Sequence, residues 1–201
     1  MYGISVLVAT VLLIVSGLDY VRRAWIGQTS PVPATWILIQ VTLTLSFWMY
    51  WNSPEKSWTA NIAVTAGLVN ASIIFFGVMA SHIRHRTLRV AFNKLQAWCL
   101  VGGGVIVIFW LISRRPLTSY ILVQCIALVA YIGTVKKLWT AKGSSEPLFL
   151  WAAVLSASVI AIYPAWVKHD IFSWVYIIRA VPSTSFVIYL ISRAKARNVH
   201  T

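Results

Sequence analysis

Acidic residues are nearly absent from this chain of 201 residues. It contains 17 Lys and Arg but only four Asp and Glu, and charged residues make up 10% of the total. Soluble globular domains carry about 25% charged residues. The shortage excludes an ordinary soluble domain, and 59% of the residues are hydrophobic instead. We therefore expect a multi-pass integral protein of the cell membrane.

Groups that build catalytic or cofactor sites are also scarce. Cys99 and Cys125 lie inside apolar runs, which does not favour a disulfide or a metal site. His82 and His85 have helical i,i+3 spacing, but arginines flank them and no third ligand accompanies them. Every lysine lies in a loop or at the end of an apolar run, whereas a retinal Schiff base needs a lysine deep in a helix. The expectation is no cofactor, no metal, no catalytic residue and no enzymatic activity.

Seven apolar stretches are long enough to cross a bilayer as helices, since a crossing needs about 20 residues. Their expected ranges are 2–20, 33–51, 59–80, 97–113, 117–135, 148–167 and 171–192. Trp, Tyr and Phe gather at their ends, which is typical of the head-group level. The connections are too short for a soluble domain, so we expect residues 1–201 to form a single all-α transmembrane domain.

Basic residues are distributed unevenly between the two sides of this expected bundle. The connections after the first, third and fifth spans and the C-terminal tail contain 12 Lys and Arg, whereas the other side contains four. Cytoplasmic loops are enriched in Lys and Arg, so we expect the N-terminus outside and the C-terminus in the cytoplasm. This placement favours contact with anionic lipid head groups over binding to nucleic acid.

A sequence repeat relates the first three spans to the last three. The matched landmarks are Arg22-Arg23-Ala24-Trp25 with Lys136-Lys137-Leu138-Trp139, Trp36 with Trp151, and Trp58 with Trp174, at offsets of 114, 115 and 116 residues. We expect two three-helix repeats, in residues 1–80 and 117–192, joined by a linker helix at 97–113. An odd linker makes the repeats parallel, related by an axis along the membrane normal, as in some transporters.

This three-plus-one-plus-three plan resembles the SWEET sugar transporters and the wider PQ-loop family. The half-motif is also similar to one in uncharacterised bacterial multi-pass proteins. It consists of Tyr20, Arg22, Arg23, Gly27, Thr29, Pro31, Pro33 and Trp36 in the first half, and of Thr134, Lys136, Lys137, Ser144, Ser145, Glu146, Pro147 and Trp151 in the second. The Pro-Gln pair that names the PQ-loop family is absent. The resemblance implies that polar residues on the third span of each half line a substrate site, which points to Asn70 and to Asn61.

Arg179 is the most unusual residue, because it lies about 12 Å deep in the last span at 1.5 Å per residue. A charge at that depth is costly and is often functional. Together with Ser183 and Gln124 it is a candidate for binding an anionic or hydroxyl-rich substrate in a central cavity. Two alternatives remain open for it, snorkelling outward or a structural pair with Asp170, and for Asn70 the alternative is interhelical hydrogen bonding.

Asp19, at the cytoplasmic end of the first span, is the one candidate for proton coupling, although an ion pair with Arg22 or Arg23 explains it as well. Two hypotheses follow. The first is a facilitative transporter of a small polar solute, sugar-like or anionic, with a cavity between the halves. The second is a non-transporting membrane subunit or receptor of the same architecture, and either one could form a homo-oligomer.

Overall fold

The computed structural model describes residues 1–86, 90, 92, 94–140 and 146–198, and within them it contains eight helices and no strand. The helices are α1 (Tyr2–Trp25), α2 (Pro33–Trp51), α3 (Ile62–Arg84), α4 (Lys94–Ser113), α5 (Pro116–Thr140), α6 (Leu148–Ile160), α7 (Ile162–Lys168) and α8 (Ile171–Asn198). All seven expected spans are helical, and α1 and α8 extend about one turn beyond the expected ranges. The second polar turn of the repeat, residues 143–147, lies largely outside the described residues.

Prolines set several of the helix boundaries. Pro33 and Pro116 occupy the first position of α2 and α5, where the missing N–H has no helical partner to lose. Pro164 cannot donate to the carbonyl one turn earlier, at Ile160, and the helix breaks there into α6 and α7. Pro182 lies inside α8 without ending it.

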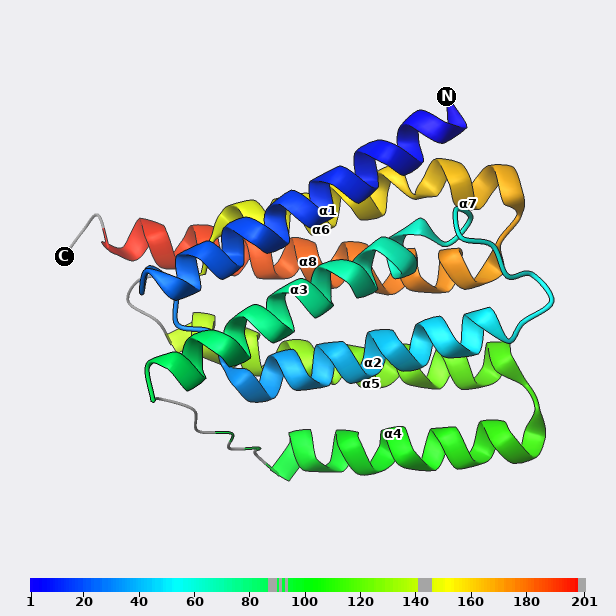
Figure 1. Ribbon diagram of the computed structural model, residues 1–201, viewed down its shortest axis with the longest axis horizontal. Coiled ribbons are helices and arrows are strands. Elements are labelled where there is room, and N and C mark those ends of the chain that lie inside the picture. Colours follow the sequence, from blue (N-terminus) through cyan, green and yellow to red (C-terminus); the bar gives the residue numbers. More distant parts are fainter. Residues whose placement is uncertain (87–89, 91, 93, 141–145, 199–201) are drawn as a thin grey trace.

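Six of the elements form a closed ring around a central axis. Going around it, α1 packs against α3, α3 against α2, α2 against α5, α5 against α8, α8 against α6, and α6 against α1. Helix α4 lies outside this ring and packs mainly against α5, at the lower edge of Figure 1. Successive long helices run in alternating directions along the bundle (Figure 1). The interior of the ring is therefore shared by helices from both ends of the sequence.

Six helical segments are long and apolar enough to cross a bilayer: α1, α3, α4, residues Pro116–Lys136 of α5, α6 joined with α7, and residues Ile171–Arg197 of α8. This finding indicates a multi-pass integral membrane protein. Helix α2 is not among the six, and its 19 residues include Gln40 and several Thr and Ser. Thr42 and Ser46 are buried, because α2 is covered by α3, α5 and α4.

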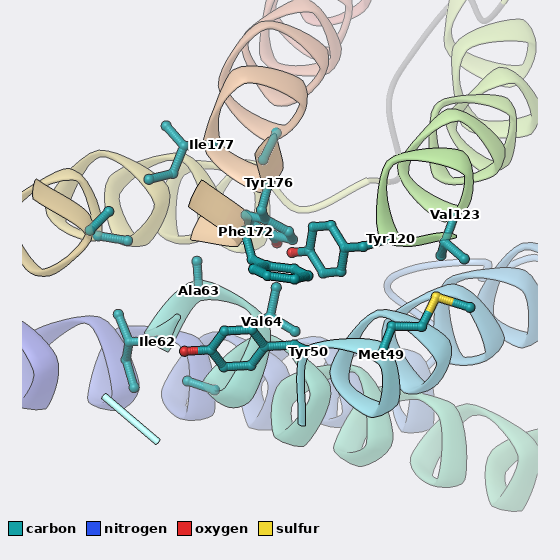
Figure 2. Packing of buried hydrophobic residues seen from close by; sticks show 14 of the residues in the cluster. Met49, Tyr50, Ile62, Ala63, Val64, Tyr120, Val123, Phe172, Tyr176 and Ile177 are labelled. Atoms are coloured by element: carbon teal, nitrogen blue, oxygen red, sulfur yellow. The ribbon is translucent and has the colours of Figure 1, made fainter. Parts of the chain in front are cut away.

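The bundle has two chemically different ends. We call the basic end the one at which α1, α3, α5 and α8 terminate. The described basic residues there include Arg22, Arg23, Arg84, Lys195 and Arg197. At the opposite end the core is aromatic, and Figure 2 shows Phe172 lying between the rings of Tyr50 and Tyr120. The ring centroids of Phe172 are 5.4 Å from Tyr50 and 5.1 Å from Tyr120, both in edge-on arrangements.

Candidate functional site

A small cavity of about 60 Å³ lies on the axis of the ring. All six ring elements contribute to its wall, with Leu13 from α1, Trp36 from α2, Asn70 from α3, Tyr131 from α5, Trp151 from α6 and Tyr176 from α8. Helix α4 contributes nothing to it. We call this space the central cavity. Its wall combines aliphatic side chains with four aromatic ones, Trp36, Tyr131, Trp151 and Tyr176, and it has room for a few water-sized molecules.

Two residues that line the central cavity have a buried polar atom with no hydrogen-bond partner among the described residues. The atoms are Oδ1 of Asn70 and Nε1 of Trp151. Buried polar groups are nearly always hydrogen-bonded, so these two residues have hydrogen-bonding capacity that an occupant could use after a rotation of the side chain. Trp36 differs from Trp151 in this respect, because its Nε1 donates to the hydroxyl of Tyr20 at 3.2 Å.

Asn70 comes close to α1 because Gly17 lies opposite it. A Cβ atom at position 17 would collide with Oδ1 of Asn70. The absence of a side chain at Gly17 therefore lets α3 present a polar group at the centre of the bundle.

A second, smaller space adjoins the central cavity on the side of the basic end. Its volume is about 10 Å³, and it shares Trp36 and Trp151 with the central cavity. Glu146 lies here with only 7% of its surface exposed, next to the Tyr20 hydroxyl. Sequence analysis placed Glu146 in a polar turn and missed its burial.

At the opposite end the central cavity is closed by a hydrogen-bonded cluster around Asp170, with Tyr50, Phe172 and Ser173, which we call the plug. Asp170 accepts hydrogen bonds from the hydroxyl of Tyr50 at 2.8 Å and from the backbone N–H groups of Phe172 at 2.9 Å and Ser173 at 3.2 Å. Asn61 is fully buried beside it, and its Nδ2 lies 3.5 Å from the hydroxyl of Tyr120. Asn61 therefore belongs to the plug and not to the wall of the central cavity.

Arg179 lies outside the central cavity and is held by α5. Its Nε donates to Oε1 of Gln124 at 3.1 Å, and one terminal nitrogen donates to the hydroxyl of Tyr131 at 3.4 Å. The guanidinium also lies over the ring of Tyr176, 4.6 Å from its centroid. Gln124 in turn donates to the hydroxyl of Ser46 on α2 at 2.8 Å. The structural pair with Asp170 that the sequence offered as an alternative is not formed, because the guanidinium is held by Gln124 and Tyr131 of α5.

Arg179 instead lines a groove of about 620 Å³ between α5 and α8. Gln124 and Ser183, two further predicted substrate-binding residues, line the same groove. Ser183 donates its hydroxyl to the backbone carbonyl of Arg179 at 2.8 Å, one turn earlier. Of the five residues predicted to bind substrate, the structure thus places three in this groove, Asn70 in the central cavity and Asn61 in the plug.

Asp19 lines neither space. Its Oδ2 lies 2.6 Å from Nε of Arg23, so it forms the ion pair within α1 that the sequence offered as the alternative to proton coupling. Arg23, one turn further along the helix, is the partner, and not Arg22.

Four residues of the two spaces were missed as site residues: Trp36, Trp151, Tyr131 and Tyr176. A signal for the first two was present in the sequence. Trp36 and Trp151 are matched landmarks of the repeat, but they were interpreted as residues of the membrane interface. Tyr131 is a polar residue at membrane depth, which was a weaker signal, and no signal distinguished Tyr176 from other aromatic residues.

Among the described residues no group of three or more His, Cys, Asp or Glu is placed to hold a metal ion. Comparison with known proteins gives no match, since no family model, no curated protein and no solved structure is significantly similar to the chain. Function has to be inferred from the chemistry of the central cavity and the groove.

Proposed function

We propose that the protein is a facilitative transporter of a small polar solute, which binds in the central cavity. The observation that carries this proposal is a cavity enclosed by six helical elements, with two lining residues, Asn70 and Trp151, that each keep a polar atom without a partner among the described residues. A solute with both donors and acceptors can pair with these two atoms, and its apolar faces can stack on the aromatic wall. A small sugar or polyol has this chemistry.

The proposed architecture is seven spans in two parallel repeats, α1–α3 and α5–α8, with α4 as the linker. The order of contacts supports it, because the first helix packs on the third and the third on the second in both halves. The helix starts also support it, since α5, α6 and α8 begin 114, 115 and 109 residues after α1, α2 and α3. Trp58 and Trp174 do not fit as a matched pair, because Trp58 precedes α3 whereas Trp174 lies inside α8. This arrangement is the one implied by the resemblance to SWEET and PQ-loop proteins.

The described conformation fits a closed state of such a transporter. The plug around Asp170 and Phe172 separates the cavity from one side, and the packing around Trp36, Trp151 and Glu146 separates it from the other. Transport requires these two layers to open in turn, with the halves rocking about the solute. Asp19 is held by Arg23, which supports passive transport and not coupling through this carboxylate.

A flux measurement tests this proposal. Protein in liposomes is mixed with iso-osmotic solutions of neutral solutes, from urea and glycerol to hexoses, and swelling is followed by light scattering. We expect at least one solute to enter faster than in protein-free liposomes. Asn70→Leu should slow its entry about tenfold, the effect of about 1.4 kcal/mol.

Asn52→Leu is the matched control, because Asn52 is exposed at the end of α2 and its side chain donates to the Trp48 carbonyl. This variant should transport like the wild type. If every solute enters at the protein-free rate, transport is excluded for the panel and the non-transporting subunit or receptor becomes the better proposal.

The proposed orientation has the basic end in the cytoplasm and the N-terminus outside. Cysteines at Glu55 and His85, both exposed and at opposite ends, test it in a variant without Cys99 and Cys125. A membrane-impermeant thiol reagent added to intact cells should label position 55 and not position 85. The reverse pattern would invert the topology.

A further inference from the structure

The groove between α5 and α8 opens toward the surface of the bundle that faces the bilayer. Its walls are apolar, with Ile121, Cys125 and Leu128 from α5 and Ile178 and Phe186 from α8, and all five side chains are exposed. At about 620 Å³ it lies within the size range of small-molecule sites, roughly 300–1,000 Å³. An elongated apolar molecule from the membrane fits these walls.

Arg179 places an uncompensated positive charge in this apolar groove. No carboxylate of a described residue lies within ion-pairing distance of its guanidinium. The four acids of the chain are elsewhere: Asp19 with Arg23, Asp170 in the plug, Glu55 on the surface and Glu146 near Tyr20. A charge at membrane depth is costly in free energy when no opposite charge lies beside it, so an anion bound next to Arg179 would be stabilising.

The guanidinium is also fixed in position. Gln124 holds its Nε, Tyr131 accepts from one terminal nitrogen, and the ring of Tyr176 lies beneath it. Gln124 is itself anchored to Ser46, so the contact is braced by a third helix. These contacts use two of the five N–H donors of an arginine, which leaves donors for a bidentate anion.

The depth of Arg179 selects among amphiphilic anions. It stands eight residues after the first residue of α8, or about 12 Å along the helix. A phosphodiester head group remains charged and stays at the membrane surface. A carboxylic acid is neutral once protonated, can reach this depth at little cost, and can ionise beside a guanidinium.

We propose that this groove binds a single-chain carboxylic acid from the bilayer, such as a long-chain fatty acid. Its carboxylate pairs with Arg179, and its chain lies along the apolar walls of α5 and α8. Binding in the groove does not require transport, because Arg179 and Gln124 line the groove and not the central cavity, although Tyr131 and Tyr176 also line the cavity. Occupancy would fix the position of α5 relative to α8.

Photo-crosslinking in phosphatidylcholine nanodiscs tests this proposal on the unmodified chain. The probe is palmitic acid with a diazirine in its chain, and labelled peptides are mapped by mass spectrometry. Labelling should concentrate on residues 121–132 and 175–186, and excess palmitate should remove it. Hexadecanol and phosphatidylglycerol at the same concentration should not compete.

Two variants separate the charge from general effects on the fold. Arg179→Gln should reduce saturable labelling at least tenfold. Arg193→Gln should leave it unchanged, because Arg193 lies on the same helix but stacks on Trp139, 4.7 Å from its centroid and outside the groove. Arg179→Lys should retain part of the labelling, since it keeps the charge but loses the planar fork.

Several results would overturn the proposal. Labelling spread evenly over lipid-facing helices such as α4 would show a lipid-exposed surface without a site. Equal competition by hexadecanol would remove the role of the carboxylate, and equal competition by phosphatidylglycerol would identify a phospholipid as the occupant. If the Arg179→Gln variant does not insert into the membrane, the competition experiments on the wild-type protein still show whether the site requires a carboxylate.

Discussion

Asn70 and Arg179 stand at the same place in the third helix of each half of the proposed repeat, and their surroundings differ. Each lies eight residues after the first residue of its helix, α3 or α8. The residues opposite them also correspond, since Gly17 and Tyr131 each lie 15 residues after the start of α1 and α5. In the first half a glycine faces an asparagine, and in the second a tyrosine faces an arginine.

The size of the facing side chains explains why Asn70 is enclosed between α1 and α3 whereas Arg179 lies at the groove between α5 and α8. Gly17 and Gly77 let α1 and α3 pack closely, with Asn70 and Val21 filling the places where Cβ atoms would stand. Tyr131 lies instead between Arg179 and the central cavity, and a groove of about 620 Å³ remains between α5 and α8. The same helix positions thus place one polar side chain inside the ring, next to Gly17, and the other at the groove between α5 and α8.

The largest difference between the halves is expected at the N-terminal caps of α3 and α8. Asp170 caps α8 and binds the Tyr50 hydroxyl, whereas Asn61 at the cap of α3 makes no side-chain cap bond. Asp170→Ala should lower the free energy of unfolding by about 3 kcal/mol, because a cap is lost and a buried hydroxyl loses its acceptor. Asn61→Ala should cost about 1 kcal/mol. Chemical unfolding in detergent measures both, and equal losses would contradict the difference between the caps.

A side chain at position 17 should disturb the close packing of α1 against α3, which has no counterpart between the described residues of α5 and α8. Gly17→Ala introduces a Cβ where Asn70 Oδ1 lies, and we expect a loss of about 2 kcal/mol from overpacking. Gly104→Ala is the matched control on α4, since a Cβ there meets nothing within 4 Å. The difference in thermal midpoint between the two variants is the measurement. Equal midpoints would mean that α1 and α3 separate without cost.

A substitution at Gln124 tests whether the hydrogen bonds of Gln124 to Arg179 and Ser46 stabilise the protein. Gln124→Leu deprives both Arg179 and Ser46 of a hydrogen bond and should lower the free energy of unfolding by about 1.5 kcal/mol. Gln40→Leu, on the partly exposed face of α2, removes exposed or half-buried contacts with Ser72 and Thr44 and should cost less than about 1 kcal/mol. If Gln40→Leu lowered the free energy of unfolding more than Gln124→Leu, the hydrogen bonds of Gln124 would not be the ones that stabilise this region.

The smallest difference in stability is expected between Trp151→Phe and Trp36→Phe, and it separates binding from packing. Each replacement removes the same ring volume from a buried position, so each costs packing free energy. Trp36→Phe should cost about 1 kcal/mol more, because its bond to Tyr20 is lost, whereas Nε1 of Trp151 has no partner among the described residues. Solute entry should respond in the opposite order, with Trp151→Phe slower than Trp36→Phe. A transport rate unchanged by Trp151→Phe would remove this nitrogen from the proposed site.

The sequence predicted the helices well and the site only in part. Helix positions follow from the lengths of apolar runs and from prolines such as Pro33 and Pro116, which are local properties. Arg179 was identified because charged residues at membrane depth are rare. Asn70 was identified because the resemblance to SWEET and PQ-loop proteins implies a polar residue on the third span at the substrate site. Their assignment to one cavity was not supported, since the direction of a side chain depends on what stands opposite it on another helix.

The sequence by itself determined that this is a helical membrane protein with an arginine deep in its last apolar run, because composition and run length decide that. Only the tertiary structure decided which polar groups meet. Asp170 reaches Tyr50 across 120 positions of sequence, and Gln124 reaches Ser46 across 78. Such contacts are fixed by the packing of helices, which sequence spacing does not contain. The same packing leaves Asn70 unpaired inside the ring and gives Arg179 a groove at its edge.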